Sequence, residues 1–153
     1  MIKILFVCHG NICRSPMAEF VLKDMVRKKG WDKQFYIASS ATSNEEIGNG
    51  VHRGTIKKLQ KHNISCNGKR AIRLQLEDYD KYDYFIGMDD RNITNMKHIL
   101  DSQDDTKIFR LLDLSDSPRN IADPWYTGDF DSTYNDIVEG CNLLLKHLKS
   151  ALD

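Results

Sequence analysis

Residues 2–30 constrain the fold more than any other part of the chain, because they have the pattern of a buried strand, a tight loop and a helix in direct succession. The run at 2–7 is short, β-branched and apolar apart from one lysine, as in a central parallel strand covered on both faces. Ser15 is placed to cap a helix with Pro16 at its first position, and Gly30 suits the end of that helix. This succession predicts the first unit of a parallel α/β sheet.

The rest of the chain continues the alternation of strands and helices. We expect further strands at 35–39, 84–88 and 108–112, and helices at 53–62, after residues 89–90 and over 134–148. The last helix has the longest apolar stripe and is expected to close the far side of the sheet. Residues 115–129 contain two prolines, a glycine and several aspartates, so we expect a long loop there. The pattern predicts one α/β domain over residues 1–151, a four-stranded parallel sheet with helices on both faces and the ligand at the carboxyl ends of the strands.

The overall composition argues against several classes of function. With 22 basic and 22 acidic residues the formal net charge is zero, so no overall field would recruit nucleic acid or an anionic membrane. The N-terminal apolar run is too short for a signal peptide or a membrane span, so we expect a cytoplasmic protein with reduced cysteines. The sequence has no C-x-x-C pair and its five histidines are scattered, so we expect no metal and no cofactor.

The loop after the first strand has the pattern of a phosphate site that contains a nucleophile. Between Cys8 and Arg14 lie five residues that line the expected site, namely His9, Gly10, Asn11, Ile12 and Cys13. A loop of this length at a helix start can turn its backbone N–H groups toward an anion, with Gly10 and Asn11 suited to positive φ angles. Arg14 can bind two phosphoryl oxygens at once, and the positive surroundings favour a thiolate at Cys8 that Ser15 assists by a hydrogen bond. Cys8 can therefore attack phosphorus.

Such a reaction also needs a proton donor for the leaving group. Asp123, which precedes Pro124 in the expected loop, is the candidate acid, and it would later act as the base for the attacking water. Trp125 and Tyr126 follow directly and could wall the pocket and stack on an aromatic substrate. For Tyr126 a role in the core is an equally good interpretation.

The complete set of motifs resembles the low-molecular-weight protein tyrosine phosphatase family. The matching stretches are CHGNICRS at 8–15, SPMAE at 15–19, SSATS at 39–43, IGN at 47–49, DYFIGMD at 83–89 and DPWY at 123–126. The resemblance implies a flavodoxin-like, phosphotyrosine phosphatase I-like fold and hydrolysis of phosphotyrosine in protein substrates. It implies Cys8 as nucleophile, Arg14 as phosphate clamp and Asp123 as general acid and base. It also implies that Asn11 and Ser39 hold the shape of the loop. Separately, we expect a monomer or weak homodimer.

Two features depart from the family pattern. Glu45 or Asn44 stands where relatives often place an aromatic residue on the pocket rim, and an acidic rim would disfavour acidic phosphopeptides. A histidine that some relatives carry has no match at residues 68–71.

Cys13 lies five residues after Cys8, so oxidation could close a disulfide between them, a switch that the resemblance also implies.

Three other functions are compatible with parts of this pattern. A thioredoxin-coupled arsenate reductase would use the same phosphate-binding loop, but it relays oxidation through further cysteines. Here only Cys66 could lie near the loop, and it has no second cysteine to pair with. Protein-arginine phosphatases tend to have a threonine where this chain has Ile12, and isoleucine favours tyrosine. A phosphate-binding module without catalysis would not need a nucleophile, a clamp and an acid together.

Overall fold

The computed structural model, which describes residues 1–152, contains one four-stranded parallel sheet. The strands lie in the order β2-β1-β3-β4, so β1 pairs with β2 on one side and with β3 on the other. Their bounds are β1 Ile2–Cys8, β2 Phe35–Ala41, β3 Tyr84–Gly87 and β4 Ile108–Arg110. The predicted α/β fold class is confirmed.

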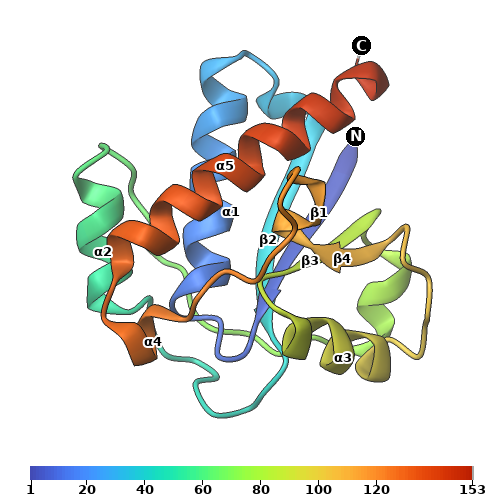
Figure 1. Ribbon diagram of the computed structural model, residues 1–153, viewed down its shortest axis with the longest axis horizontal. Coiled ribbons are helices and arrows are strands. Elements are labelled where there is room, and N and C mark those ends of the chain that lie inside the picture. Colours follow the sequence, from blue (N-terminus) through green and yellow to red (C-terminus); the bar gives the residue numbers. More distant parts are fainter. Residues whose placement is uncertain (153) are drawn as a thin grey trace.

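Helices cover both faces of the sheet (Figure 1). One face carries α1 (Arg14–Lys28), α2 (Arg53–Gln60) and α5 (Phe130–Leu148) over a large apolar core. The other face carries α3 (Asp90–Ile99) and the 3₁₀ helix η2 (Leu76–Asp80) over a smaller core. Alternation along β1 divides the two cores, since Ile4 and Phe6 face the first and Leu5 and Val7 the second.

The position of α5 corrects one expectation. We expected the last helix to close the far side of the sheet, but it lies on the same face as α1 and packs against it. Its apolar stripe fits there because Gly140 allows Leu111 to approach closely, and a Cβ atom at Gly140 would lie 2.3 Å from Leu111 Cγ. Packing partners of a helix stripe are chosen by such complementarity, which periodicity alone does not reveal.

Three local expectations also differ from the structure. Helix α1 begins at Arg14 with Cys13 as its N-cap, so Ser15 lies inside the helix and does not cap it. The last strand ends at Arg110, because residues Leu111–Leu114 turn into a 3₁₀ helix. The expected loop at 115–129 contains a short helix, α4 (Pro124–Thr127), which Asp123 caps. None of the helices within residues 1–152 is long and apolar enough to cross a membrane.

Candidate active site

The candidate site lies at the carboxyl end of the sheet, where β1 passes into α1. Cys8 is the last residue of β1 and pairs in register with Ala41 of β2. The loop formed by residues 9–13, here called the Cys8 loop, connects it to Arg14 at the first position of α1 (Figure 1). The carboxyl end of β1 and the N-terminus of α1 therefore both face the Cys8 loop, which favours an anion there.

The backbone of the Cys8 loop is anchored through its carbonyl groups. Donors from the end of β2 and the start of α2 hold it, namely Thr42 N to Cys8 O at 3.0 Å, Ser43 N to His9 O at 3.0 Å, His52 N to Ile12 O at 2.8 Å and Thr55 Oγ1 to Cys13 O at 3.1 Å. Within the described chain, no acceptor takes a hydrogen bond from the backbone amides of residues 9–13. Anchored carbonyls and free amides are the arrangement that an anion nest requires.

Asn11 supports the strained point of the Cys8 loop. Its φ angle is 58°, in the left-handed region that asparagine tolerates, whereas Gly10 does not adopt positive φ as we expected. The Asn11 side chain donates to Ser15 Oγ at 2.8 Å and to Ser39 Oγ at 2.9 Å, and it accepts from Ile72 N at 3.1 Å. All its polar atoms are engaged, so the amide ties the loop to α1, to β2 and to the segment after α2.

The Cys8 sulfur is hydrogen-bonded to Ser15 at the start of α1. Cys8 Sγ lies 3.0 Å from Ser15 Oγ and accepts a longer contact of 3.5 Å from Ser15 N. Because Ser15 Oγ already accepts from Asn11, its own proton is free to be donated to sulfur. A hydroxyl donor and the N-terminus of α1 therefore both contact the Cys8 sulfur.

A buried ion pair lies behind this hydrogen-bond chain. Ser39 Oγ donates to Glu19 Oε1 at 2.6 Å, so Ser39 is an acceptor toward Asn11. Lys69 lies 3.7 Å from the same carboxylate oxygen and donates to the Ser39 carbonyl at 2.8 Å. Burial lowers the pKa of Lys69, while Glu19 opposes that shift. Lys69 thus lies in the segment where the histidine of some relatives has no match, and it supports the Cys8 loop through Glu19 and Ser39.

Arg14 is held rigidly on one side and left free on the other. Its Nη1 donates to Asp89 Oδ2 at 2.6 Å and to the Ile121 carbonyl at 2.9 Å. Its Nη2 has only a long contact of 3.4 Å to Asp123, and its buried Nε has no partner among the described residues. Burial alone would lower the pKa of Arg14, but Cys8 and the hydrogen-bonded Asp89 raise it above its ordinary value. The free Nε and Nη2 edge has the geometry for two oxygens of one phosphoryl group.

Asp123 lies across the cavity from the Cys8 loop, at the start of α4. One carboxylate oxygen accepts from Trp125 N at 3.1 Å and so caps α4, while the other faces Arg14. His52 stacks on Phe130 with ring centroids 5.3 Å apart and meets Trp125 edge-on at 5.6 Å. These aromatic contacts place the α4 segment against the Cys8 loop.

A cavity of about 100 Å³ joins these groups. It brings together the sequence-predicted residues Cys8, His9, Gly10, Ile12, Cys13, Arg14, Glu45, Asp123, Trp125 and Tyr126. Asn11, Ser15 and Ser39 lie outside its lining and support it through the hydrogen bonds described above. Trp125 and Tyr126 are 57% and 82% exposed, so both form the rim and neither belongs to the core.

The rim opposite the aromatic residues is acidic. Glu45 Oε2 accepts a hydrogen bond from His9 Nε2 at 2.9 Å, so this carboxylate is engaged with a side chain of the loop itself. Glu46 also lines the cavity and was not among the predicted residues. Its aliphatic part lies 3.3 Å from the position that a Cβ atom at Gly10 would occupy, so a larger residue at Gly10 would crowd the entrance.

The second cysteine of the loop, Cys13, is a buried thiol. Burial, with smaller effects from Cys8 and Asp123, raises the pKa of the Cys13 thiol to about 12. Cys13 is therefore protonated at neutral pH and is no competing nucleophile. All four cysteines are free and buried.

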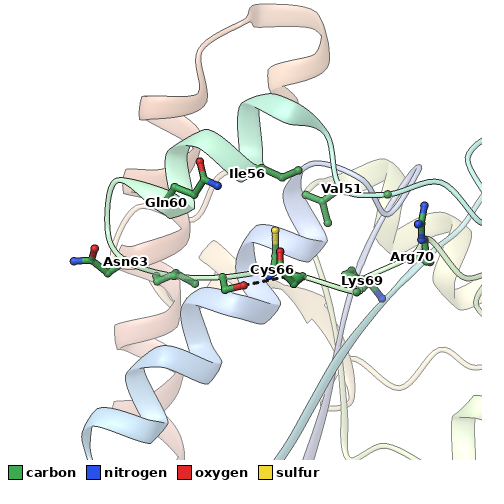
Figure 2. Close-up of a pocket in the computed structure, with 12 residues that line it drawn as sticks. Val51, Ile56, Gln60, Asn63, Cys66, Lys69 and Arg70 are labelled. Atoms are coloured by element: carbon green, nitrogen blue, oxygen red, sulfur yellow. Dashed lines mark hydrogen bonds between the residues drawn. The ribbon is translucent and has the colours of Figure 1, made fainter.

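A larger hollow of about 530 Å³ lies apart from this chemistry, between α2 and residues 63–70 (Figure 2). Cys66 lines it, and its side chain points toward α2. Burial raises the pKa of the Cys66 thiol, so it stays protonated near neutral pH. Within residues 1–152 no group of three His, Cys, Asp or Glu side chains is placed to hold a metal ion.

Sequence reasoning missed the side chains that do not line the cavity themselves but hold the residues that do. Asp89 directly precedes a helix expected from the sequence; it caps α3 through one oxygen, and through the other it holds Arg14. Glu19 and Lys69 gave no signal, because a carboxylate inside a helix and a lysine in a loop are ordinary surface patterns. Only the three-dimensional contacts identify them.

Comparison with known proteins places the chain among phosphatases. A family model described as low molecular weight phosphotyrosine protein phosphatase matches residues 3–153. The low molecular weight protein-tyrosine-phosphatase YfkJ of Bacillus subtilis is 39% identical over 151 residues, covering 97% of each chain. PtpA of Staphylococcus aureus, of the same description, is 34% identical over 97% of this chain and 94% of its own.

Solved structures agree with the sequence relatives. The crystal structure of YfkJ covers 99% of this chain and 96% of its own, with a TM-score of 0.93. A low molecular weight protein tyrosine phosphatase from Streptococcus pyogenes, 40% identical, covers 97% of this chain and 93% of its own with a TM-score of 0.87.

Proposed function

The chain belongs to the low molecular weight phosphotyrosine protein phosphatase family, and we propose that it hydrolyses phosphotyrosine in protein substrates with Cys8 as nucleophile, Arg14 as phosphate clamp and Asp123 as general acid and base. The observation that carries this proposal is the state of Arg14. It is only 2% exposed, yet its Nε lacks a partner among residues 1–152. A buried guanidinium with an unsatisfied edge facing free loop amides has the properties of a site built for a dianion.

In the first step the Cys8 thiolate attacks phosphorus and forms a sulfur–phosphorus bond. The bond between phosphorus and the tyrosine oxygen breaks, and Asp123 gives its proton to the leaving phenolate. The loop amides and the free edge of Arg14 bind the equatorial oxygens, where charge is concentrated in the transition state. Asp89 binds Nη1 and so fixes the orientation of Arg14. The Nε and Nη2 edge of the guanidinium is thereby left for the phosphate.

In the second step a water molecule hydrolyses the cysteinyl phosphate. Asp123, now ionised, takes a proton from the water, whose oxygen attacks phosphorus. The sulfur–phosphorus bond breaks, inorganic phosphate leaves, and Ser15 stabilises the released thiolate by its hydrogen bond.

The shape of the cavity supports an aryl phosphate as substrate. Trp125 and Tyr126 provide exposed aromatic surface at the rim, and Ile12 adds apolar surface on the loop side. A phenyl ring placed between them keeps the phosphate at the floor near Cys8. The same Ile12 side chain offers no polar partner to a guanidinium, so phosphoarginine is the weaker candidate substrate.

The setting of the enzyme follows from the same reasoning. We propose that residues 1–151 act as one domain, that the protein works in the cytoplasm as a monomer or weak homodimer, and that neither nucleic acid nor membrane is a partner. The zero formal net charge supports the last part, since no overall field attracts a polyanion.

We also propose that oxidation regulates the site. Peroxide would convert the Cys8 thiolate to a sulfenic acid, which condenses with the Cys13 thiol to a disulfide and releases water. The disulfide protects Cys8 from further oxidation, and a thiol reductant restores both cysteines. Counting free thiols and measuring activity before and after mild peroxide treatment tests this; a stable sulfinic acid at Cys8 contradicts it.

One set of kinetic measurements tests the main proposal. Hydrolysis of p-nitrophenyl phosphate, phosphotyrosine and phosphoarginine, and reduction of arsenate, are compared for the wild type, Cys8→Ser and Asp123→Ala. We expect phosphotyrosine to be preferred, Cys8→Ser to be inactive, and Asp123→Ala to lose about 10²- to 10⁴-fold in kcat. Activity that survives in Cys8→Ser refutes the mechanism.

A further inference from the structure

A second hollow adjoins the catalytic cavity, and His9 lines both of them. Its volume is about 190 Å³, and it lies where the end of β2 meets α3. We call it the His9–Arg73 pocket. The polar residues that line it are His9, Thr42, Ser43, Arg73, Asn95 and His98.

The lining of this pocket has one sign of charge. Arg73 carries a permanent positive charge, and the two imidazoles of His9 and His98 add donors. No carboxylate is found among the described residues that line it. Glu45, which contacts His9 Nε2, lines the catalytic cavity and not this pocket. The His9–Arg73 pocket therefore favours an anionic ligand.

One buried group in this pocket lacks a partner. The Thr42 side chain is 7% exposed, and its Oγ1 has no hydrogen-bond partner within residues 1–152. A buried hydroxyl in this state is unfavourable, so it is rare in a folded protein. This oxygen is covered in the free protein, so an oxyanion beside Arg73 accepts its hydrogen only after the Thr42 side chain rotates about χ1.

The pocket is directly coupled to the nucleophile. Thr42 N bonds to Cys8 O and Ser43 N to His9 O, each at 3.0 Å, so its wall is one hydrogen bond away from the Cys8 loop. An extended substrate chain advances about 3.3 Å per residue. Because His9 lines both cavities, we expect a side chain one to three residues from the phosphotyrosine to reach the His9–Arg73 pocket while the phosphate occupies the catalytic cavity.

We propose that the His9–Arg73 pocket binds an acidic side chain of the substrate polypeptide close to the phosphotyrosine, which rests on the proposed phosphatase function. The specificity of the enzyme is thus divided at His9. The Glu45 rim disfavours acid at the entrance of the catalytic cavity, and the His9–Arg73 pocket selects acid beyond His9. A free phosphate or sulfate ion has the same chemistry, but a pocket that shares a wall with the catalytic cavity lies where the substrate chain must pass.

The test compares phosphotyrosine peptides that carry Glu or Gln at one position, scanned from three residues before to three residues after the phosphotyrosine. The measured quantity is the ratio of kcat/KM for the Glu peptide to that for the Gln peptide. At low ionic strength we expect one position at which the wild-type ratio reaches roughly two- to fivefold, the range of an exposed ion pair.

Two variants and one control assign this preference to the pocket. Arg73→Gln is expected to bring the ratio to about one with unchanged kcat/KM for p-nitrophenyl phosphate, which is too small to reach the pocket. Thr42→Val, which keeps the side-chain shape, is expected to lower the ratio in part while raising stability. Arg70→Gln is the matched control, because Arg70 lines the separate hollow of Figure 2 and should leave the ratio unchanged.

The possible outcomes separate the proposals. A wild-type ratio near one at every position, a ratio that Arg73→Gln leaves unchanged, or an equal fall in Arg70→Gln overturns the inference. Sulfate exchanged for chloride at constant ionic strength is expected to leave the wild-type ratio intact, and its loss assigns the pocket to a free oxyanion instead. Absence of p-nitrophenyl phosphate hydrolysis in the wild type refutes the phosphatase function itself.

Discussion

The Glu19–Lys69 pair beneath the Cys8 loop offers a quantitative test of how the site is supported. Glu19 is buried, accepts from Ser39 Oγ at 2.6 Å and lies 3.7 Å from Lys69 Nζ. The variant Glu19→Gln keeps the length of the side chain and removes its charge. It leaves Lys69 buried without an anion, and it removes the acceptor-only group that orients Ser39 toward Asn11.

The expected cost follows from the geometry. Two unit charges 3.7 Å apart attract each other by about 4–5 kcal/mol at an effective dielectric constant of 20. Removing one member of a buried pair costs about 3–5 kcal/mol, because the other member remains desolvated. Lys69 keeps its hydrogen bond to the Ser39 carbonyl, so we expect the lower end, a loss of about 3 kcal/mol in the free energy of unfolding.

Urea unfolding at neutral pH measures this loss, and a double-mutant cycle with Lys69→Met isolates the pair. We expect the double variant to be more stable than the sum of the two single losses predicts, by about 1–3 kcal/mol. Lys23→Met is the control, because Lys23 also contacts Glu19 but its side chain is 44% exposed and should contribute below about 1 kcal/mol. The turnover of p-nitrophenyl phosphate should fall in Glu19→Gln, since Asn11 and Ser15 lose their fixed orientation. Additive single losses, or a loss in Lys23→Met as large as in Glu19→Gln, would refute this reasoning.

Three further predictions concern other parts of the molecule. Asn11→Ala should destabilise more than Asn11→Gly, by about 1–2 kcal/mol in chemical unfolding, because both lose the same hydrogen bonds but only alanine is strained at φ 58°; equal losses contradict this. Gly140→Ala should lower stability by about 1–3 kcal/mol in spite of the better helix propensity, since its Cβ would meet Leu111 at 2.3 Å, and a rise in Tm contradicts the close packing of α5. Burial raises the pKa of Cys13 from 9.0 to about 12. Below pH 9.0 the thiol is protonated in both the folded and the unfolded chain, and its full contribution to stability is present. Between pH 9 and 12 the unfolded chain releases a proton that the folded chain retains. Stability should therefore fall over that range, less steeply in Cys13→Ala, and an unchanged slope in this variant counts against the shift.

The alternation of strands and helices was enough to predict the fold class, and the pattern of residues 2–30 predicted where Cys8, the candidate nucleophile, would lie. Periodicity and the helix-start residues are local properties, and parallel strands bring their carboxyl ends together whatever the details of packing. The candidate acid, Asp123, was identified only because the Cys8 loop required one. Its neighbours in sequence could not show that α4 would form there or that His52 and Phe130 would hold it.

The choice of face for α5 and the true start of α1 were not readable in the same way. An apolar stripe shows that a helix is buried but not against which partner, and Gly140 gained its meaning only from the approach of Leu111. Ser15 has the residue type of a helix cap, yet its hydroxyl bonds to Cys8 and Asn11 instead. Competition between a local cap and a tertiary hydrogen bond is decided by the folded structure.

By itself, the sequence determined the fold class and the main candidates for the chemistry, because these depend on residue type and spacing along the chain. The tertiary structure alone decided which groups stand behind them: Asp89 on Arg14, Glu19 and Lys69 beneath Asn11, and Arg73 beside His9. These contacts join segments separated by tens of residues, and they depend on burial and orientation. Those properties exist only after the strands and helices have packed.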